Sequence, residues 1–92
     1  MGAYQIIYSN IVADEDIPRL GKAESESIEQ AINTKLTKAP EDFGKPLRRP
    51  YQGYWTLRQG NYRIIYSVTR QLVRVVAILP RDRAYTELLK RL

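Results

Sequence analysis

The stretch 53-GYWTLRQGNYRIIYSV-68 decides the fold, because it contains two short runs that are typical of β-strands. Aromatic and β-branched residues, which favour extended backbone, dominate residues 54–58 and 62–68. Only Gln59-Gly60-Asn61 separates the two runs. A connection this short requires an antiparallel hairpin.

Another strand is predicted over 72-LVRVVAIL-79, after the short connection 69–71. The strands over 62–68 and 72–79 are apolar on both faces for much of their length. Each face of the sheet therefore needs a cover of its own.

A long helix is predicted over 22–39 as the first cover. Its apolar residues Ile28, Ile32 and Leu36 recur every four positions. Glutamates crowd its first turns and lysines its last turn, which complements the helix dipole, and Pro40 is expected to end it. A shorter, weaker helix is expected before it, over 13–21.

The second cover is predicted to be a C-terminal helix over 82–92. Asp82 is expected to cap it. Its apolar positions form one stripe that should face the sheet, made of Tyr85, Leu88, Leu89 and Leu92.

An N-terminal strand is predicted over 4–10. It should join the sheet at an edge or beside the strand over 72–79. Residues 40–53, with three prolines and two glycines, are expected to form an irregular, exposed connection. The predicted fold class is α+β with the order βααβββα. A small twisted antiparallel sheet of about four strands packs with an N-terminal helical hairpin and a C-terminal helix. The 92 residues are expected to form a single domain, 1–92.

The composition excludes several kinds of chemistry. The chain has no cysteine and no histidine, so it lacks disulfides, thiolate zinc sites and the commonest general base. No cofactor and no metal are therefore expected. Its apolar runs fall far short of the roughly 20 residues that a membrane helix needs, which predicts a cytoplasmic protein with no membrane partner.

Charge is divided unevenly along the chain. Residues 1–44 carry four basic and eight acidic side chains, a net charge of −4, whereas residues 45–92 carry eleven basic and two acidic side chains, a net charge of +9. Nine of the eleven cations are arginines, whose planar guanidinium suits bidentate contact with phosphate. A polyanionic partner is one interpretation, and a charge that only keeps a small domain soluble is the other.

Arg63 is the most informative residue of the basic half. It lies among isoleucines and tyrosines in a strand that is predicted to be mostly buried. Desolvating a guanidinium is costly, so Arg63 should have an anionic partner, either a carboxylate of the protein or a ligand.

Hairpin geometry predicts where the arginines meet. The start of the strand over 62–68 lies beside the end of the strand over 72–79, so Arg63 and Arg81 fall at the same end of the sheet, with Arg58 alongside. Tyr85 follows Arg81 by one helical turn. Three arginines and a tyrosine at one end of a basic sheet favour a phosphate site.

This arrangement resembles the RelE/ParE toxin superfamily of bacterial type II toxin–antitoxin systems over nearly the whole chain. The residues that carry the resemblance are 36-LTKAP-40, 53-GYWTLRQGNYRIIYSV-68 and 81-RDRAY-85. The middle motif, with its arginine, glycine, tyrosine-arginine and tyrosine, is the most specific of the three.

The resemblance implies a RelE-like toxin, an endoribonuclease (mRNA interferase) that binds the ribosomal A site, cuts mRNA and inhibits translation until a cognate antitoxin neutralises it. It assigns catalytic roles to Arg63 and Arg81, which would neutralise phosphorane charge, and to Tyr85, which would stack on a base or assist proton transfer. It implies RNA binding by Lys45, Arg48, Arg49, Tyr54, Thr56, Arg58 and Arg83.

Two departures from the RelE-like pattern leave the general base unidentified. The strand over 54–58 has no lysine, with Lys45 the only one nearby, and Pro80 stands where many relatives have histidine. Two other functions therefore remain open. One is a ParE-like inhibitor of DNA gyrase without chemistry of its own, and the other is a nucleic-acid-binding module without toxicity.

Overall fold

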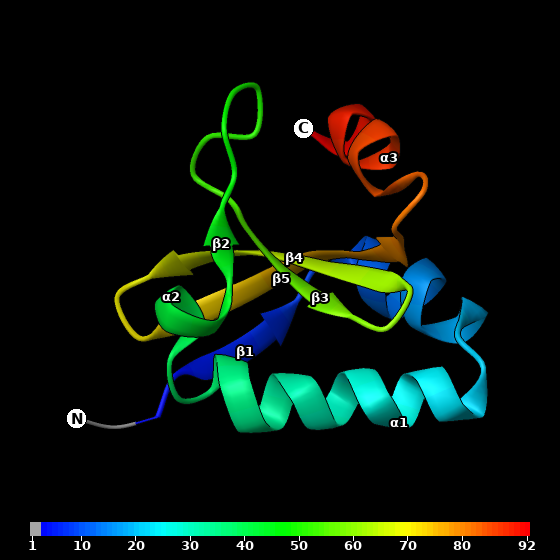
Figure 1. Ribbon diagram of the computed structural model, residues 1–92, viewed down its shortest axis with the longest axis horizontal. Helices are drawn as coiled ribbons and strands as arrows, with labels where there is room; N and C mark the ends of the chain where they lie inside the picture. The colour runs from blue at the N-terminus through cyan, green and yellow to red at the C-terminus, as the bar shows by residue number, and fades with distance from the viewer. Residues whose placement is uncertain (1–2) are drawn as a thin grey trace.

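The computed structural model describes residues 3–92, in which helices cover both faces of a five-stranded sheet (Figure 1). The strands lie in the order β1-β5-β4-β3-β2. Their bounds are Gln5–Tyr8 for β1, Lys45–Pro46 for β2, Trp55–Gln59 for β3, Tyr62–Thr69 for β4 and Leu72–Pro80 for β5. The predicted α+β class is confirmed, and so are the two hairpins β3-β4 and β4-β5.

The sheet is mostly antiparallel, as predicted, with one parallel pair that was not predicted. β1 does lie at an edge beside β5, but it runs parallel to β5. Its direction is set by the helices that follow it and not by a turn, so the strand pattern of residues 4–10 holds no signal of it. The fifth strand, β2, is two residues long and was missed because so short a strand has no pattern to detect.

The helices before β2 differ from the prediction in detail. A π-helical turn η1 (Val12–Asp16) and a 3₁₀ turn η2 (Ile17–Arg19) occupy the segment of the weaker helix. The long helix comprises α1 (Lys22–Ala31) and a π-helical continuation η3 (Ile32–Leu36), so it ends before Pro40. Pro40 opens a short helix α2 (Pro40–Phe43), so the expected irregular connection holds a helix as well as β2. None of the helices in residues 3–92 is long and apolar enough to cross a membrane.

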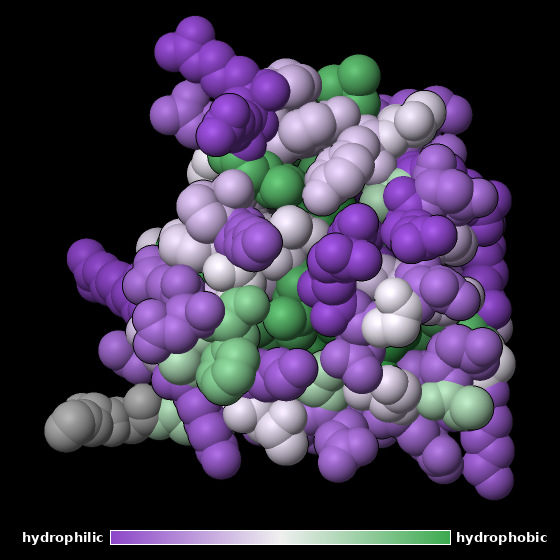
Figure 2. Space-filling view, in the orientation of Figure 1, coloured by the Kyte–Doolittle hydropathy of each residue, from purple (hydrophilic) through white to green (hydrophobic). Residues whose placement is uncertain are grey.

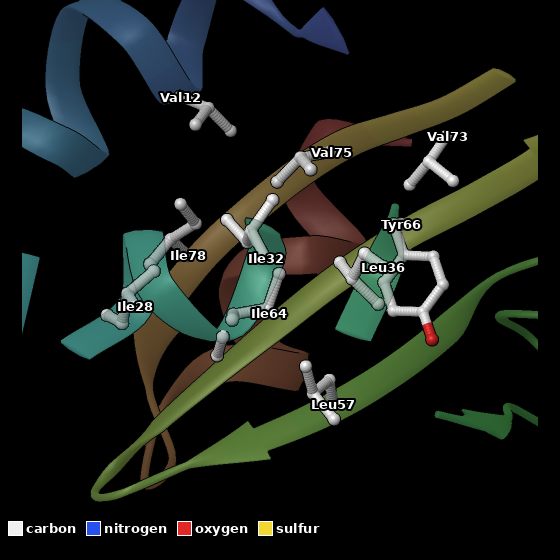
Figure 3. Close-up of a cluster of buried hydrophobic side chains, with 11 residues drawn as sticks. Val12, Ile28, Ile32, Leu36, Leu57, Ile64, Tyr66, Val73, Val75 and Ile78 are labelled. Carbon is white, nitrogen blue, oxygen red and sulfur yellow. The ribbon is translucent and has the colours of Figure 1, made fainter. Parts of the chain in front are cut away.

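The larger core lies between the sheet and the long helix, as predicted. Ile28, Ile32 and Leu36 are buried against β-strand side chains that include Ile64 and Val75 (Figure 3). The side chains that share this face of the sheet alternate along β4, as the period of two requires. The apolar stripe of the long helix is therefore structural.

The second core lies on the other face, under helix α3 (Ala84–Arg91). Ala84 and Leu88 of α3 are buried on Ile65 of β4. The predicted stripe is wrong in part, because Leu89 and Leu92 are 54% and 53% exposed.

The predicted cap of α3 is also wrong. Arg83 occupies the N-cap position, and Asp82 makes no capping hydrogen bond. The helix begins two residues later than predicted. Ala84 and Leu88, one turn apart, face the sheet, and Leu89 and Leu92 remain exposed.

Tyr66 anchors α2 from within the larger core. Its side chain is fully buried, and its hydroxyl donates a hydrogen bond of 2.6 Å to the carbonyl oxygen of Pro40. Gly44 packs so closely on this hydroxyl that a Cβ there would collide with it. Burial raises the pKa of Tyr66 above its ordinary value, with a smaller contribution from Glu41.

Tyr66→Phe should lower the free energy of unfolding by about 0.5–1.5 kcal/mol. The Pro40 carbonyl loses the shorter of its two hydrogen bonds and keeps the one that Gly44 N donates at 3.2 Å. The raised pKa adds a pH effect. The stability that the neutral phenol contributes is fully present below the unfolded pKa of about 10 and is lost as the pH rises through the higher folded value. Denaturant titrations at pH 8 and above pH 10 measure both effects. Equal stability and an equal pH slope in the two proteins would contradict this role for Tyr66.

Candidate functional site

A cavity of about 400 Å³ opens beside β3. β2 pairs only with Trp55 and Thr56 of β3, so within the described chain no strand covers the outer edge of the rest of β3. Figure 2 shows hydrophobic atoms at the bottom of a hollow on this face, bordered by hydrophilic side chains. The cavity is lined by Lys35, Phe43, Lys45, Thr56, Leu57, Arg58, Arg63 and Tyr85.

The cavity carries only positive charge. Its cations are Lys35, Lys45, Arg58 and Arg63, and no carboxylate of residues 3–92 lines it or forms a salt bridge with these four side chains. Arg58 and Arg63 are directly opposite each other in the β3-β4 ladder. Like charges at opposed positions destabilise a sheet, so the fold tolerates a repulsion that an anionic ligand would relieve.

Arg63 also has unsatisfied hydrogen-bonding capacity. Its Nη1 atom is buried and has no hydrogen-bond partner in the described chain. The Oγ1 atom of Thr56, on the neighbouring strand, is in the same condition. A buried polar group without a partner costs about 1–3 kcal/mol. No carboxylate of residues 3–92 forms a salt bridge with Arg63, so the expected anionic partner is not one of these carboxylates.

Tyr85 is held at the cavity by the loop between β2 and β3. The hydroxyl of Tyr51 donates a hydrogen bond of 2.9 Å to the carbonyl oxygen of Tyr85. The two rings pack with their centroids 5.6 Å apart and tilted by 40°. Tyr51 was not predicted as a site residue, because a contact between residues 34 positions apart leaves no local pattern.

The other wall of the cavity comes from the N-terminal half. Lys35 of η3 places its Nζ atom 5.9 Å from the centre of the Phe43 ring, which α2 presents at the rim. Both residues were missed. Lys35 was assigned to the helix dipole alone, and Phe43 lies in a segment that was predicted to be irregular.

Five of the ten predicted site residues line the cavity, and five do not. Lys45, Thr56, Arg58, Arg63 and Tyr85 line it. Arg81 does lie at the predicted end of the sheet, since its backbone N–H donates a hydrogen bond of 2.9 Å to the carbonyl oxygen of Asn61. Arg81 is exposed and does not line the cavity.

The remaining four lie elsewhere. Arg48 and Arg49 are exposed in the loop after β2. Tyr54 lines a separate cavity of about 300 Å³ near the end of α3, and Arg83 lines a small one of about 50 Å³ beside Asp16. The prediction grouped residues by their strand and their charge. That grouping cannot tell which residues the loop after β2 and helix α3 place outside the cavity.

Arg58→Gln should stabilise the free protein by about 0.5 kcal/mol, because it removes the repulsion between opposed arginines. The gain should shrink as salt screens the charges. Thermal unfolding at low and high ionic strength measures it, with Arg74→Gln as the control, since Arg74 is also an exposed strand arginine but pairs with Ser67. Equal effects of the two substitutions would show that the Arg58–Arg63 opposition costs nothing.

Comparison with known proteins identifies the family. Residues 5–85 match the family described as "ParE toxin of type II toxin-antitoxin system, parDE". This chain belongs to that family. A curated relative, Toxin RelE of Mycobacterium tuberculosis, is 28% identical over 75 residues, which are 79% of this chain and 77% of the relative. The protein is therefore a type II toxin of the RelE/ParE superfamily.

Solved structures of RelE/ParE toxins share the fold. The toxin–antitoxin complex RelBE2 of Mycobacterium tuberculosis contains a chain with a TM-score of 0.80 and 23% identity, over 86% of this toxin and 99% of that chain. The isolated Escherichia coli RelE toxin gives a TM-score of 0.71 and 20% identity, over 97% of this toxin and 98% of that chain. All eight residues that line the cavity lie within the family match.

Proposed function

We propose that this toxin is a RelE-like endoribonuclease that cuts mRNA in the ribosomal A site, and that the cavity beside β3 is its active site. The observation that carries the proposal is the buried Nη1 of Arg63, which has no partner in the described chain and belongs to a cavity whose charged lining residues are all cations. A phosphate would supply two things that the cavity lacks, negative charge and hydrogen-bond acceptors. The curated relative named Toxin RelE supports a RelE-like activity.

Cleavage would proceed by attack of a ribose 2′-oxygen on the adjacent phosphorus. The 2′-hydroxyl gives its proton to a base, the new O–P bond closes a 2′,3′-cyclic phosphate, and the P–O5′ bond breaks. The leaving 5′-oxygen takes up a proton and becomes a hydroxyl. Extra negative charge develops on the phosphoryl oxygens in the transition state, where fixed cations are most effective.

The roles follow from position in the cavity. Arg63 and Arg58, opposed in the ladder, would hold the phosphate and neutralise its developing charge. Lys45 lies opposite Thr56 on β2 and brings the amine nearest to them in the sheet. Tyr85, fixed by Tyr51, would stack on a base or assist proton transfer. Arg81, at the same end of the sheet, would contact the RNA strand outside the cavity.

We propose further that a cognate antitoxin silences the toxin by covering this face. RelBE2 was solved as a toxin–antitoxin complex. A segment that places carboxylates against the cavity cations would satisfy the same groups as phosphate does and would exclude RNA.

The second candidate is a ParE-like inhibitor of DNA gyrase. One observation favours it, namely that the family match is described as a ParE toxin. In that case the cavity would be a binding surface and no RNA would be cut.

Expression in a bacterium, followed by mapping of transcript ends and DNA breaks, separates the two candidates. The nuclease predicts cuts in phase with codons in translated mRNA and intact DNA. The gyrase inhibitor predicts intact transcripts, double-strand breaks in DNA and an SOS response. Normal growth at full expression would overturn both candidates and leave a nucleic-acid-binding module.

A further inference from the structure

Phe43 is an exposed aromatic residue without an assigned role. Its side chain is 50% exposed, although phenylalanine favours burial. It lies at the rim of the cavity that holds Arg63. Phe43 belongs to neither hydrophobic core, so packing of the cores does not explain its position.

The position of Phe43 is nevertheless fixed. Phe43 closes α2, which Tyr66 anchors through its hydrogen bond to Pro40. The fit of Gly44 against the Tyr66 hydroxyl leaves the chain little room to move at the next residue. Lys35 packs over the ring of Phe43 at 5.9 Å. A ring that is already held in place loses little conformational entropy when a ligand stacks on it.

Two aromatic rings line the cavity together with its arginines. Phe43 comes from α2 and Tyr85 from α3, and Figure 1 shows these two helices on different sides of β3. Arg58 and Arg63 project from the strands between them. Proteins that bind single-stranded RNA combine these two elements, cations for the backbone and aromatic rings on which bases stack.

We propose that Phe43 is a stacking platform for a nucleobase, so that the cavity binds two successive nucleotides of a single strand. One base stacks on Phe43 and the other on Tyr85, and the phosphate between them lies at Arg58 and Arg63. The inference rests on the proposed RNA cleavage and adds to it a subsite that the predicted site residues did not include.

A double-mutant cycle tests the platform. The probe is an mRNA on ribosomes with a vacant A site, with a 2′-O-methyl group at the scissile nucleotide to prevent attack. A second probe lacks the base of one nucleotide beside the blocked linkage. Phe43→Ala should weaken binding of the intact probe about tenfold, which is within the range for loss of one stacked base. Loss of the base should weaken binding of the probe by wild type by a similar factor, and should hardly change binding by Phe43→Ala.

Matched variants separate stacking from simple apolar contact. Phe43→Trp should bind as tightly as wild type or more tightly, and Phe43→Leu should bind as weakly as the alanine variant. Leu89→Ala, which also removes an exposed apolar side chain but lies outside the cavity, should have no effect.

The outcomes distinguish failure of the platform from failure of the nuclease site. If Arg63→Ala weakens binding while Phe43→Ala binds like wild type, the platform is overturned and the phosphate site stands. The platform would also be overturned if Phe43→Ala weakened binding of the base-free probe as much as binding of the intact probe. That result would favour a protein surface as the partner of Phe43. If Arg63→Ala binds the blocked probe and also cuts an unblocked mRNA like wild type, the proposed active site itself fails.

Discussion

Arg63→Ala should abolish growth inhibition by this toxin and lower the rate of RNA cleavage by a factor of about 10²–10³. The expected size is that of removing one fixed group that stabilises transition-state charge. The buried Nη1 of Arg63 has no hydrogen-bond partner and Arg63 forms no salt bridge in the described chain, so binding phosphate there would break none of these bonds of the fold. Cleavage of ribosome-bound mRNA by purified variants measures the loss.

The fold should survive this substitution. Alanine at position 63 removes both the repulsion with Arg58 and a buried donor without a partner, so the melting temperature should stay the same or rise. Arg74→Ala is the matched control, because Arg74 is a strand arginine that does not line this cavity. Its activity should remain at the wild-type level.

Arg81→Ala should act in the same direction. The exposed side chain of Arg81 lies outside the cavity, so we expect weaker binding of RNA to account for more of its effect than slower chemistry. Full toxicity of the Arg63→Ala, Arg81→Ala double variant would refute the site.

Asp16→Ala should have the largest effect on stability, a loss of about 3 kcal/mol. The carboxylate of Asp16 is fully buried, accepts two hydrogen bonds of 2.8 Å from Arg91 and accepts a third of 2.9 Å from Ile78 N. Its removal leaves the guanidinium of Arg91, 11% exposed, without its counter-charge. The hydrogen bond to Asp16 is also the main reason that the pKa of Arg91 is raised.

Thermal unfolding measures this loss, and a fall in melting temperature of more than about 10 °C is expected for a domain of this size. Glu15→Ala is the control, since Glu15 forms an exposed ion pair with Arg19 at 3.4 Å and such pairs contribute little. An Asp16→Leu, Arg91→Met variant should recover only part of the stability. Apolar side chains avoid the desolvation of both charges, but they leave the Ile78 N–H and the Val76 carbonyl without the partners that Asp16 and Arg91 supply. Similar melting temperatures for Asp16→Ala and Glu15→Ala would contradict the account.

The local elements could be predicted from the sequence because their signals are local. The β3-β4 hairpin follows from the residue types around Gly60, and its bounds differ from the prediction by one residue at most ends. The stripe of Ile28, Ile32 and Leu36 correctly predicted the covered face of the long helix. Hairpin geometry alone also brought Arg58 and Arg63 together.

The features that were missed depend on contacts between distant parts of the chain. Asp16 and Arg91 are 75 positions apart, and nothing in either segment marks them as a pair. The direction of β1, the short β2 and the anchoring of α2 by Tyr66 depend on the assembled fold in the same way. For this reason the sequence predicted the side of the cavity that Arg58 and Arg63 form, and the side that Lys35 and Phe43 form became visible only in the structure.

The most direct test of the nuclease proposal is to incubate the purified toxin with ribosomes that hold a defined mRNA and a vacant A site, and to map the RNA ends. The account predicts a single cut in the A-site codon, which leaves a 2′,3′-cyclic phosphate and a 5′-hydroxyl and which Arg63→Ala does not make. Intact mRNA at every toxin concentration, together with inhibition of purified DNA gyrase, would contradict it.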